Sequence, residues 1–308
     1  MKKYLLILLG SSVDEFYEAD SWPDLGDFTH ARHVFTSAGG CPLNVGAVCA
    51  SKGEDVKALD MLGKDDDSTP FLLSELERLH VDTKNIQIKE NVKNGKVVII
   101  INGDQRTMFV VDPIRPTYDV DEKIQELLND SAYIYSLMHM IERSFSSLDP
   151  LLEAKRNGAK IVLDGSSKYD DPSRVKILYT LADGLFINET DYARLKAHSD
   201  GEPKDIILNN GGEFVVVTKG SAGSILYLKD RTVSMEPVKD LEVLDSTGAG
   251  DAFAGCFLAC LMKGMTYEEA LATATVNGAY ACTVFGGLGG VASLQELKDF
   301  AKEHHYDL

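Results

Sequence analysis

From Val56 onward, short apolar runs alternate with amphipathic segments, and this alternation constrains the fold more than any other feature. The runs lie at residues 56–62, 132–138, 160–164, 184–188 and 214–218. Segments with helical spacing separate them, for example residues 70–79, 146–158 and 189–197. Apolar strands spaced by helices are typical of βαβ units, in which helices cover both faces of a parallel sheet. The pattern predicts an α/β fold, a three-layer α/β/α sandwich with a mostly parallel central sheet.

The final third of the chain has a helical pattern instead. Thr266 with Glu269, and Ser293 with Glu296, have the spacing of capping boxes at helix starts. No internal repeat, low-complexity tract or linker rich in Pro, Gly and Ser divides the sequence. We therefore expect residues 1–308 to form a single domain.

Two segments interrupt the alternation. Residues 29–35 and 87–111 have the pattern of antiparallel strands, the second with turn signals at Asn94-Gly95 and Asn102-Gly103. Neither segment is followed by a helical pattern, so we expect a small sheet beside the main one. Such a sheet is a natural lid, and its segments are predicted at about residues 12–36 and 86–112.

The chain carries a strong net negative charge. Its 308 residues include 31 Lys and Arg against 48 Asp and Glu, a formal charge of −17. This balance argues against nucleic acid or an anionic membrane surface as the main partner. A phosphorylated ligand would have to be bound by local groups such as backbone amides, single lysines or a metal ion.

The opening residues and the cysteines indicate a cytoplasmic protein. Two lysines precede an apolar run that ends at Leu9, acidic residues follow, and no signal-peptide cleavage site is present, so residues 4–9 are predicted to be a buried first strand. No stretch is long enough to span a bilayer. The cysteines are odd in number and lack C-x-x-C pairing, which predicts small buried hydrophobic residues in a reducing compartment. They are Cys41, Cys49, Cys256, Cys260 and Cys282.

The stretch DSTGAGDAF (residues 245–253) is the most informative local motif. Gly248, Ala249 and Gly250 have little or no side chain, so a ligand can approach their backbone closely. A predicted helix follows, and the free N–H groups at its N-terminus favour an anion such as a phosphoryl group. Asp251, in the first turn, could accept a proton from an attacking hydroxyl. The alternative is an ordinary glycine-rich loop in which Asp251 only complements the helix dipole.

Other motif families do not fit this stretch. An aspartic-protease signature has Gly directly after Asp and one Thr or Ser, whereas Ser246 and Thr247 both intervene here. The chain has no G-x-x-x-x-G-K-[ST] phosphate loop. GAGDAF lacks the third glycine of the dinucleotide fingerprint and lies far from the first βα turn. A hydride-transfer enzyme is therefore disfavoured.

Motifs along essentially the whole chain match one family in order. DSTGAGDAFAG (245–255) resembles the second signature of the ribokinase-like sugar kinases, also called the phosphofructokinase B (pfkB) family, with Ser246 in place of the usual Thr. AGGCPLNVG (38–46) resembles the first signature. The further matches are LLGSSVDEF (8–16), HVDT (80–83), FINETD (186–191) and VVTKGSAGS (216–224).

The resemblance implies a role for each matching position. Asp251 would be the general base, and Gly248, Ala249 and Gly250 would form the anion hole around the transferring phosphoryl group. The residues implied to hold acceptor hydroxyls are Asp14, Gly39, Gly40 and Asn44. Those implied to bind the nucleotide and its phosphates are Asn188, Thr218, Lys219, Gly220, Gly223 and Asn277. The implied cofactors are ATP and Mg²⁺, with a monovalent cation as a further candidate; Glu189 and Asp191 would reach the metal only through water.

The predicted function is transfer of the γ-phosphoryl group of ATP to a hydroxymethyl group of a small sugar or sugar-like alcohol. One alternative is a nucleoside kinase of the same fold, whose base pocket would use Phe16, Tyr17, Trp22 and Phe109. Another is a non-catalytic sugar-sensing homologue. A phosphorylated acceptor would need basic residues, for which Arg106 and Arg115 are the candidates.

Two positions differ from the family pattern, and one common feature of the family predicts the oligomeric state. Asp191 stands where the family often has Glu, so its carboxylate has a shorter reach. DGSSKYD, which begins at Asp164, lacks the Asn and Arg of an Asp-x-Asn-x-Arg stretch, and this disfavours the fructokinase and ketodeoxygluconate kinase branches. Lid strands of the family often pair between subunits, so we expect a homodimer built through residues near 29–35 and 96–111.

Overall fold

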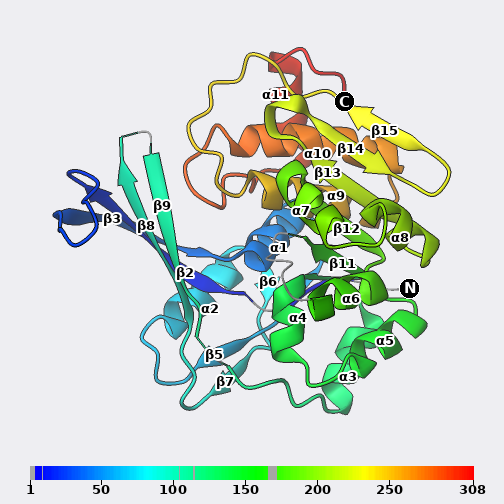
Figure 1. Ribbon diagram of the computed structural model, residues 1–308, viewed down its shortest axis with the longest axis horizontal. Coiled ribbons are helices and arrows are strands. Elements are labelled where there is room, and N and C mark those ends of the chain that lie inside the picture. Colours follow the sequence, from blue (N-terminus) through cyan, green and yellow to red (C-terminus); the bar gives the residue numbers. More distant parts are fainter. Residues whose placement is uncertain (1–3, 9, 104, 114, 166–171) are drawn as a thin grey trace.

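A central sheet of nine strands runs through the molecule (Figure 1). The computed structural model describes residues 4–8, 10–103, 105–113, 115–165 and 172–308. The strand order is β15 (Thr232–Met235), β14 (Ser224–Tyr227), β13 (Phe214–Thr218), β12 (Gly184–Asn188), β11 (Lys160–Asp164), β10 (Tyr133–Leu137), β1 (Leu5–Leu8), β4 (Val56–Leu59) and β6 (Val81–Asp82). The strands from β13 to β6 pair in parallel, and only β14 and β15 pair antiparallel. The predicted mostly parallel sheet is therefore confirmed. Leu9, the last residue of the predicted first strand, lies outside the described residues.

Helices cover both faces of this sheet, which confirms the three-layer sandwich. Alternate residues of β1 face opposite cores, Leu5 and Ile7 on one side and Leu6 and Leu8 on the other. The first core includes residues of α1 (Cys41–Ser51), α2 (Thr69–Arg78), α9 (Ala249–Met262), α10 (Tyr267–Ala281) and α11 (Leu294–Glu303). The second includes residues of α3 (Glu122–Asp130), α4 (Met138–Ser144), α5 (Asp149–Arg156), α6 (Pro172–Leu181), α7 (Glu189–Ala197) and α8 (Pro203–Asn209).

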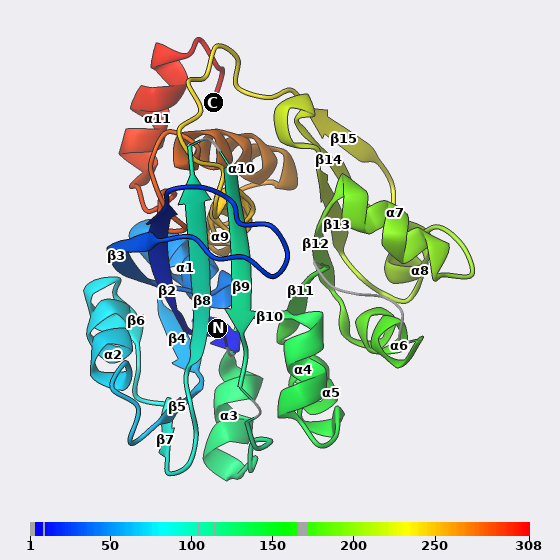
Figure 2. The ribbon, with the colours of Figure 1, turned by 60° about the vertical axis from the view of Figure 1, so that its left-hand side comes forward.

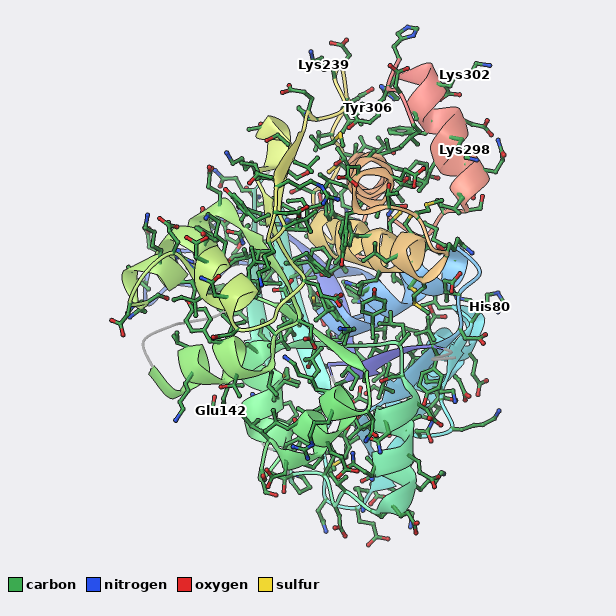
Figure 3. All side chains as sticks on the ribbon, turned by 90° about the vertical axis from the view of Figure 1, so that its right-hand side faces the viewer. His80, Glu142, Lys239, Lys298, Lys302 and Tyr306 are labelled. Carbon is green, nitrogen blue, oxygen red and sulfur yellow. The ribbon has the colours of Figure 1, made fainter. Side chains whose placement is uncertain are left out.

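The last helix shows how the sequence pattern places each layer. Leu297 and Phe300 of α11 are buried against the sandwich, whereas Lys298 and Lys302 project away from it (Figure 3). The predicted capping boxes at the starts of α10 and α11 both form. Among the described residues, no helix is long and apolar enough to cross a membrane.

A second, four-stranded sheet projects from one side of the body (Figures 1 and 2), and we call it the lid sheet. Its order is β3 (Ala31–Gly39), β2 (Ser12–Ala19), β8 (Gly95–Asn102) and β9 (Gln105–Val111). The central pair β2 and β8 is parallel, and the outer pairs are antiparallel. β8 and β9 form the hairpin predicted at Asn102-Gly103, where Gly103 has a φ of +61°.

Two details of the predicted small sheet are corrected. β3 does lead into a helix, because Gly40 alone separates it from α1. Residues 87–89 form β7 (Gln87–Lys89), which pairs in parallel with β5 (Met61–Gly63) outside the lid sheet. Asn94-Gly95 is therefore not a hairpin turn. The Asn94 side chain accepts a hydrogen bond from Gly63 N at 2.9 Å and donates to Thr69 Oγ1 at 2.9 Å, a tertiary role that a turn signal does not reveal.

Candidate active site

The glycine-rich stretch forms the N-terminus of α9, as predicted. Gly248 is the N-cap, with a left-handed φ of +74°, and a Cβ there would lie 2.2 Å from the carbonyl oxygen of Gly287. Only glycine fits that position. A Cβ on Gly250 would instead meet no protein atom within 4 Å. Glycine at this second position therefore leaves open space beside the free N–H groups of the helix.

Asp251 lies in the first turn of α9, and hydrogen-bond donors from α1 surround it. Asn44 donates from Nδ2 to Oδ2 of Asp251 at 2.8 Å, and the Cys41 thiol acts as a second donor that lowers the pKa of this carboxyl group. Burial raises the pKa of Asp251 from 3.8 to about 7, the two donors oppose that rise, and the charges of Asp164 and Asp14 add to it. A carboxylate poised near neutral pH suits a general base.

The predicted acceptor-binding residues lie next to this carboxylate. Asp14, on β2, packs over Gly39, where a Cβ would be 2.0 Å from its Oδ2. Gly40 has a φ of +105°, and a Cβ there would be 1.6 Å from the carbonyl oxygen of Gly10. Burial raises the pKa of Asp14 from 3.8 to about 6, while a hydrogen bond of 2.9 Å from Ser12 Oγ opposes the rise. Gly39 lets Asp14 approach the backbone that leads into Asn44, and Gly40 lets the same backbone approach Gly10.

A cavity of about 170 Å³ is lined in part by Asp251. Its lining residues are Asp164, Phe186, Ile187, Asn188, Thr218, Gly248, Gly250 and Asp251. Two carboxylates at its wall give it a negative charge that favours a cation. Mg²⁺ is commonly bound through few protein carboxylates together with substrate phosphates and water, so this oxygen-rich cavity fits a magnesium–nucleotide complex. Among the described residues, no group of three or more His, Cys, Asp or Glu could hold a metal ion by itself.

Two of the six predicted nucleotide-binding residues line this cavity. Asn188 and Thr218, at the ends of β12 and β13, line it directly. Asn188 also caps α7, accepting from Asp191 N at 2.8 Å and donating to Asp191 Oδ2 at 2.6 Å. Asp191 is further paired with Arg194 at 2.8 Å, so its carboxylate is occupied within the helix. Lys219 forms only a loose ion pair, 3.7 Å from Glu189.

The turn after β13 uses positive φ values, which glycine adopts without steric cost. Gly220, with a φ of +55°, begins the short 3₁₀ helix η1 (Gly220–Ala222). Gly223 has a φ of +82°, and a Cβ there would lie 2.1 Å from the carbonyl oxygen of Met235. This turn connects β13 to β14 (Ser224–Tyr227) beside Thr218.

Asn277 is hydrogen-bonded within the body of the protein. It is fully buried in α10 and does not line the cavity. Its Nδ2 donates to the carbonyl oxygens of Ala252 at 3.0 Å and Gly290 at 3.3 Å. Asn277 therefore ties α9 to the loop before α11, and its contact with the base or ribose stays a prediction.

Two residues of the site were not predicted. Asp164 lines the cavity; its position at the carboxyl end of a buried parallel strand was a usable signal, although residues 166–171 after it lie outside the described residues. Cys41 is not the buried hydrophobic residue expected. It is half-buried, with its Sγ 3.3 Å from the hydroxyl of Tyr135.

The basic residues named for a phosphorylated acceptor, and most of the aromatic residues named for a base pocket, contact other parts of the protein. Arg106, on β9, pairs with Asp245 and Thr247, and Arg115 pairs with Asp60 at 3.2 Å. The aromatic residues named for a base pocket do not converge. Phe16 is stacked on Phe35, Tyr17 and Trp22 are hydrogen-bonded to Glu15 and Gln105 respectively, and Phe109 is exposed.

Comparison with known proteins supports the family directly. The profile of the pfkB family carbohydrate kinases matches residues 4–291. Ribokinase of Mus musculus is 23% identical over 277 residues, covering 86% of this chain and 85% of that protein. Ribokinase of Staphylococcus aureus is 25% identical over 274 residues, covering 85% and 88%. An ATP-dependent 6-phosphofructokinase of Thermoanaerobacterium thermosaccharolyticum is 22% identical over 327 residues, covering 100% and 95%.

Solved structures show the same fold. Arabidopsis thaliana ribokinase in complex with ribose and ATP superposes with a TM-score of 0.81 at 20% identity, covering 98% of this chain and 99% of that one. A putative ribokinase II of E. coli in complex with ATP and Mg²⁺ gives 0.81 at 22% identity, covering 98% and 100%. Together with the glycine loop, the carboxylate that follows it and the motif order, these matches show that the chain belongs to the pfkB family of carbohydrate kinases.

Proposed function

We propose that this protein transfers the γ-phosphoryl group of ATP, bound with Mg²⁺, to a hydroxymethyl group of a small uncharged sugar or sugar-like alcohol. The observation that carries the proposal is the position of Asp251, between the Asp14–Asn44 acceptor side and the cavity beside Gly250. An acceptor hydroxyl placed next to Asp251 would meet the carboxylate base on one side and the N–H groups at the start of α9 on the other.

Each residue of the site has a role in this proposal. Asp251 takes the proton of the attacking hydroxyl. The N–H groups of Gly248, Ala249 and Gly250 stabilise the charge of the transferring phosphoryl group. Asp14 and Asn44, with the backbone of Gly39 and Gly40, orient the acceptor hydroxyls. Asn188, Thr218, Lys219, Gly220 and Gly223 lie along the nucleotide, and Mg²⁺ offsets the phosphate charge. Glu189 and Asp191 would act on the metal only through water.

The charges of the acceptor side favour an uncharged acceptor. Lys96 pairs with Glu15 at 2.7 Å, and Arg115 and Arg106 pair with Asp60 and Asp245. A phosphorylated acceptor would have to break one of these pairs, and it would approach the carboxylates of Asp14 and Asp251. A neutral polyol only exchanges hydrogen bonds with them.

The alternatives are less well supported. A nucleoside acceptor needs a flat apolar or aromatic pocket, and Phe16 is instead packed inside the lid sheet with 2% of its surface exposed. A sugar sensor would not need the intact base and anion hole.

A coupled assay of ADP release over a panel of neutral sugars, polyols, nucleosides and sugar phosphates tests the proposal. We expect turnover with a neutral sugar or polyol, and no turnover when EDTA exceeds Mg²⁺. Turnover only with a sugar phosphate or a nucleoside would contradict the acceptor class. Binding of a sugar without any ADP release would favour the sensor. Repeating the assay in K⁺ and Na⁺ buffers tests the monovalent cation.

We also propose a homodimer that forms through the lid sheet, and a cytoplasmic location where ATP is available and the cysteines stay reduced. All five cysteines are free thiols. The exposed apolar residues that support the dimer are Val34, Met108, Phe109, Val110 and Val111.

A further inference from the structure

A buried ion pair lies where the two central strands of the lid sheet leave the body. Asp60 directly follows β4, the neighbour of β1 in the central sheet, and Arg115 lies in the segment between β9 and α3. Arg115 Nη1 donates to Oδ1 of Asp60 at 3.2 Å, and the two side chains are 10% and 3% exposed respectively. The proposed function gives neither residue a task.

Each partner contacts the start of one central strand of the lid sheet. Oδ2 of Asp60 accepts a hydrogen bond from Ser11 N at 3.0 Å, and Ser11 directly precedes β2. Arg115 Nη2 lies 3.5 Å from the position that a Cβ on Gly95, the first residue of β8, would occupy. Ser12 and Gly95 are register partners in the parallel pairing of β2 with β8. The ion pair therefore holds both strands at the end where they leave the body.

The entry point of β2 determines where Asp14 lies. The Ser12 hydroxyl donates to Oδ1 of Asp14 at 2.9 Å, so the first residues of the strand orient this carboxylate. Asp251, by contrast, is positioned by α9. The separation of the proposed acceptor ligand from the proposed base therefore depends on where β2 begins, and the hydrogen bond from Ser11 to Asp60 fixes that point.

We propose that Asp60 and Arg115 are positioning residues for the acceptor: their ion pair fixes the first residues of β2 and β8 and thereby sets Asp14 within reach of the acceptor hydroxyls. Neither side chain has to touch the acceptor for this role. The inference rests on the proposed role of Asp14 as an acceptor ligand.

Stability alone gives little reason for such a pair. Taking two charges out of water costs free energy that their attraction often fails to recover, so apolar residues can frequently replace a buried ion pair without loss of stability. An apolar residue at position 60 could not accept the N–H of Ser11, however, nor that of Met61, which Oδ1 accepts at 2.7 Å. Hydrogen bonds to an ionised acceptor are strong and favour one geometry. The pair therefore specifies where Ser11 lies.

The experiment measures hydrogen exchange and steady-state kinetics in Asp60→Asn and Arg115→Met. In Asp60→Asn the amide oxygen can keep the donors of Met61 and Arg115, so Nδ2 faces the N–H of Ser11. The loss of this hydrogen bond should make the Ser11 amide exchange about tenfold faster or more. In both variants the KM for the acceptor should rise about tenfold, while kcat and the KM for ATP stay near their wild-type values.

A second buried ion pair of the central sheet provides matched control variants. Asp183 pairs with Lys155 at 3.0 Å and accepts from Ile161 N at 2.9 Å. It directly precedes β12, whose other end reaches the cavity at Asn188. Asp183→Asn and Lys155→Met should speed exchange of the Ile161 amide and lower the Tm, yet leave the KM for the acceptor unchanged. A purely structural role of the Asp60 pair predicts this same pattern for its own variants.

Arg115→Lys keeps a charge for Asp60 but lacks the planar guanidinium beside Gly95. It should fold like the wild type and give an acceptor KM between those of the wild type and Arg115→Met.

Three results would overturn the proposal: unchanged exchange at Ser11 in Asp60→Asn, a parallel rise of the KM for acceptor and ATP, or an equal rise of the acceptor KM in Asp183→Asn. Loss of turnover with sugar phosphates alone in Arg115→Met would also overturn it, because Arg115 would then be a ligand of the acceptor itself. Hydrogen exchange needs no acceptor, so it still decides whether the pair holds β2 if the acceptor panel shows no turnover, a result that would count against the proposed function alone.

Discussion

Asn44 donates a hydrogen bond of 2.8 Å to Oδ2 of Asp251, a residue 207 positions further along the chain. The contact joins α1, which begins directly after the Gly39-Gly40 pair, to α9, which begins at the glycine-rich stretch 248–250. One side-chain amide therefore connects the proposed acceptor-binding turn to the proposed base. The expected consequences concern the base, the lid sheet, the acceptor and the subunit contact.

Asp251→Asn should abolish most activity while leaving the fold intact. Asparagine keeps the size of the side chain but cannot accept the proton, and general-base contributions are about 10²–10⁴-fold. The effect of Asp251→Asn on the stability of the fold should depend on pH. The pKa of Asp251 is raised from 3.8 to about 7 in the folded state, so the folded protein holds an extra proton between these values and loses stability as the pH rises through them. Asparagine removes that loss, so the Tm of the variant relative to wild type should be higher at pH 8 than at pH 5.

Glu122→Gln is the matched control for this variant, because Glu122 is an exposed acid in the first turn of α3. If Asp251 only complemented a helix dipole, both variants would show near-normal turnover and a small Tm loss. Kinetics and thermal scans at pH 5 and pH 8 distinguish a catalytic Asp251 from one that only complements the helix dipole.

Arg106→Ala should lower kcat/KM by about tenfold or more with little change in Tm. Arg106 reaches from β9 of the lid sheet to Asp245 and Thr247, just before the glycines of α9. Asp245 also accepts from the backbone of Thr247 at 2.9 Å and of Gly286 at 3.0 Å, so the arginine joins the lid sheet to an ordered loop. A partly exposed ion pair contributes only about 0–1 kcal/mol to stability, and the loss should therefore be functional.

Arg32→Ala is the control for this effect, because Arg32 forms an exposed pair with Glu18 within the same lid sheet. Steady-state kinetics should show no loss in Arg32→Ala. Equal losses in the two variants would mean that the Arg106 contact has no special role.

The sequence pattern predicts the layers of this fold because burial of a strand on both faces requires a nearly continuous apolar run. It also predicts the glycine loop of α9, since the need for small residues beside a phosphate is local. Pairing partners are not local. Residues 87–89 have a strand pattern that fits the lid sheet equally well, and only the packing of β5 and β7 decides between them.

At the active site, too, local motifs are predictable from the sequence, whereas contacts between distant residues are not. Asp14, Asn44 and Asp251 stand in recognisable motifs, and the structure brings them together. Cys41 stands in a motif as well, but its hydrogen-bond partner is Tyr135, a residue of a distant strand with no motif of its own. Asn277 was named from the family pattern alone, and its burial between α9 and the loop before α11 gives it a structural task.

Asp14→Asn should raise the KM for the acceptor by about ten- to a hundredfold, since hydrogen bonds to a charged group contribute about 1.5–3 kcal/mol. Burial raises the pKa of Asp14 to about 6, so wild-type KM should fall as the pH rises through that value and the carboxylate ionises. Asparagine does not titrate, so this pH dependence should disappear in the variant. Glu18→Gln, an exposed acid on the same strand, should keep both the KM and its pH dependence. An acceptor KM unaffected by Asp14→Asn would remove Asp14 from the binding site.

The protein should be a dimer at micromolar concentration, and Val110→Asp should make it monomeric. β9 is an edge strand of the lid sheet, with β8 as its one neighbour there, and an open edge is a template for pairing with another chain. Its residues from Met108 to Val111 are 51% to 70% exposed, an apolar row that a second copy of the lid sheet could cover. A charge at Val110 would have to be buried in that contact, which is costly without a partner. Sedimentation equilibrium gives the mass directly, and Leu308→Asp tests whether any added charge on an exposed apolar residue has the same effect. A monomeric wild type, or a dimer that survives Val110→Asp, would place the subunit contact away from this edge.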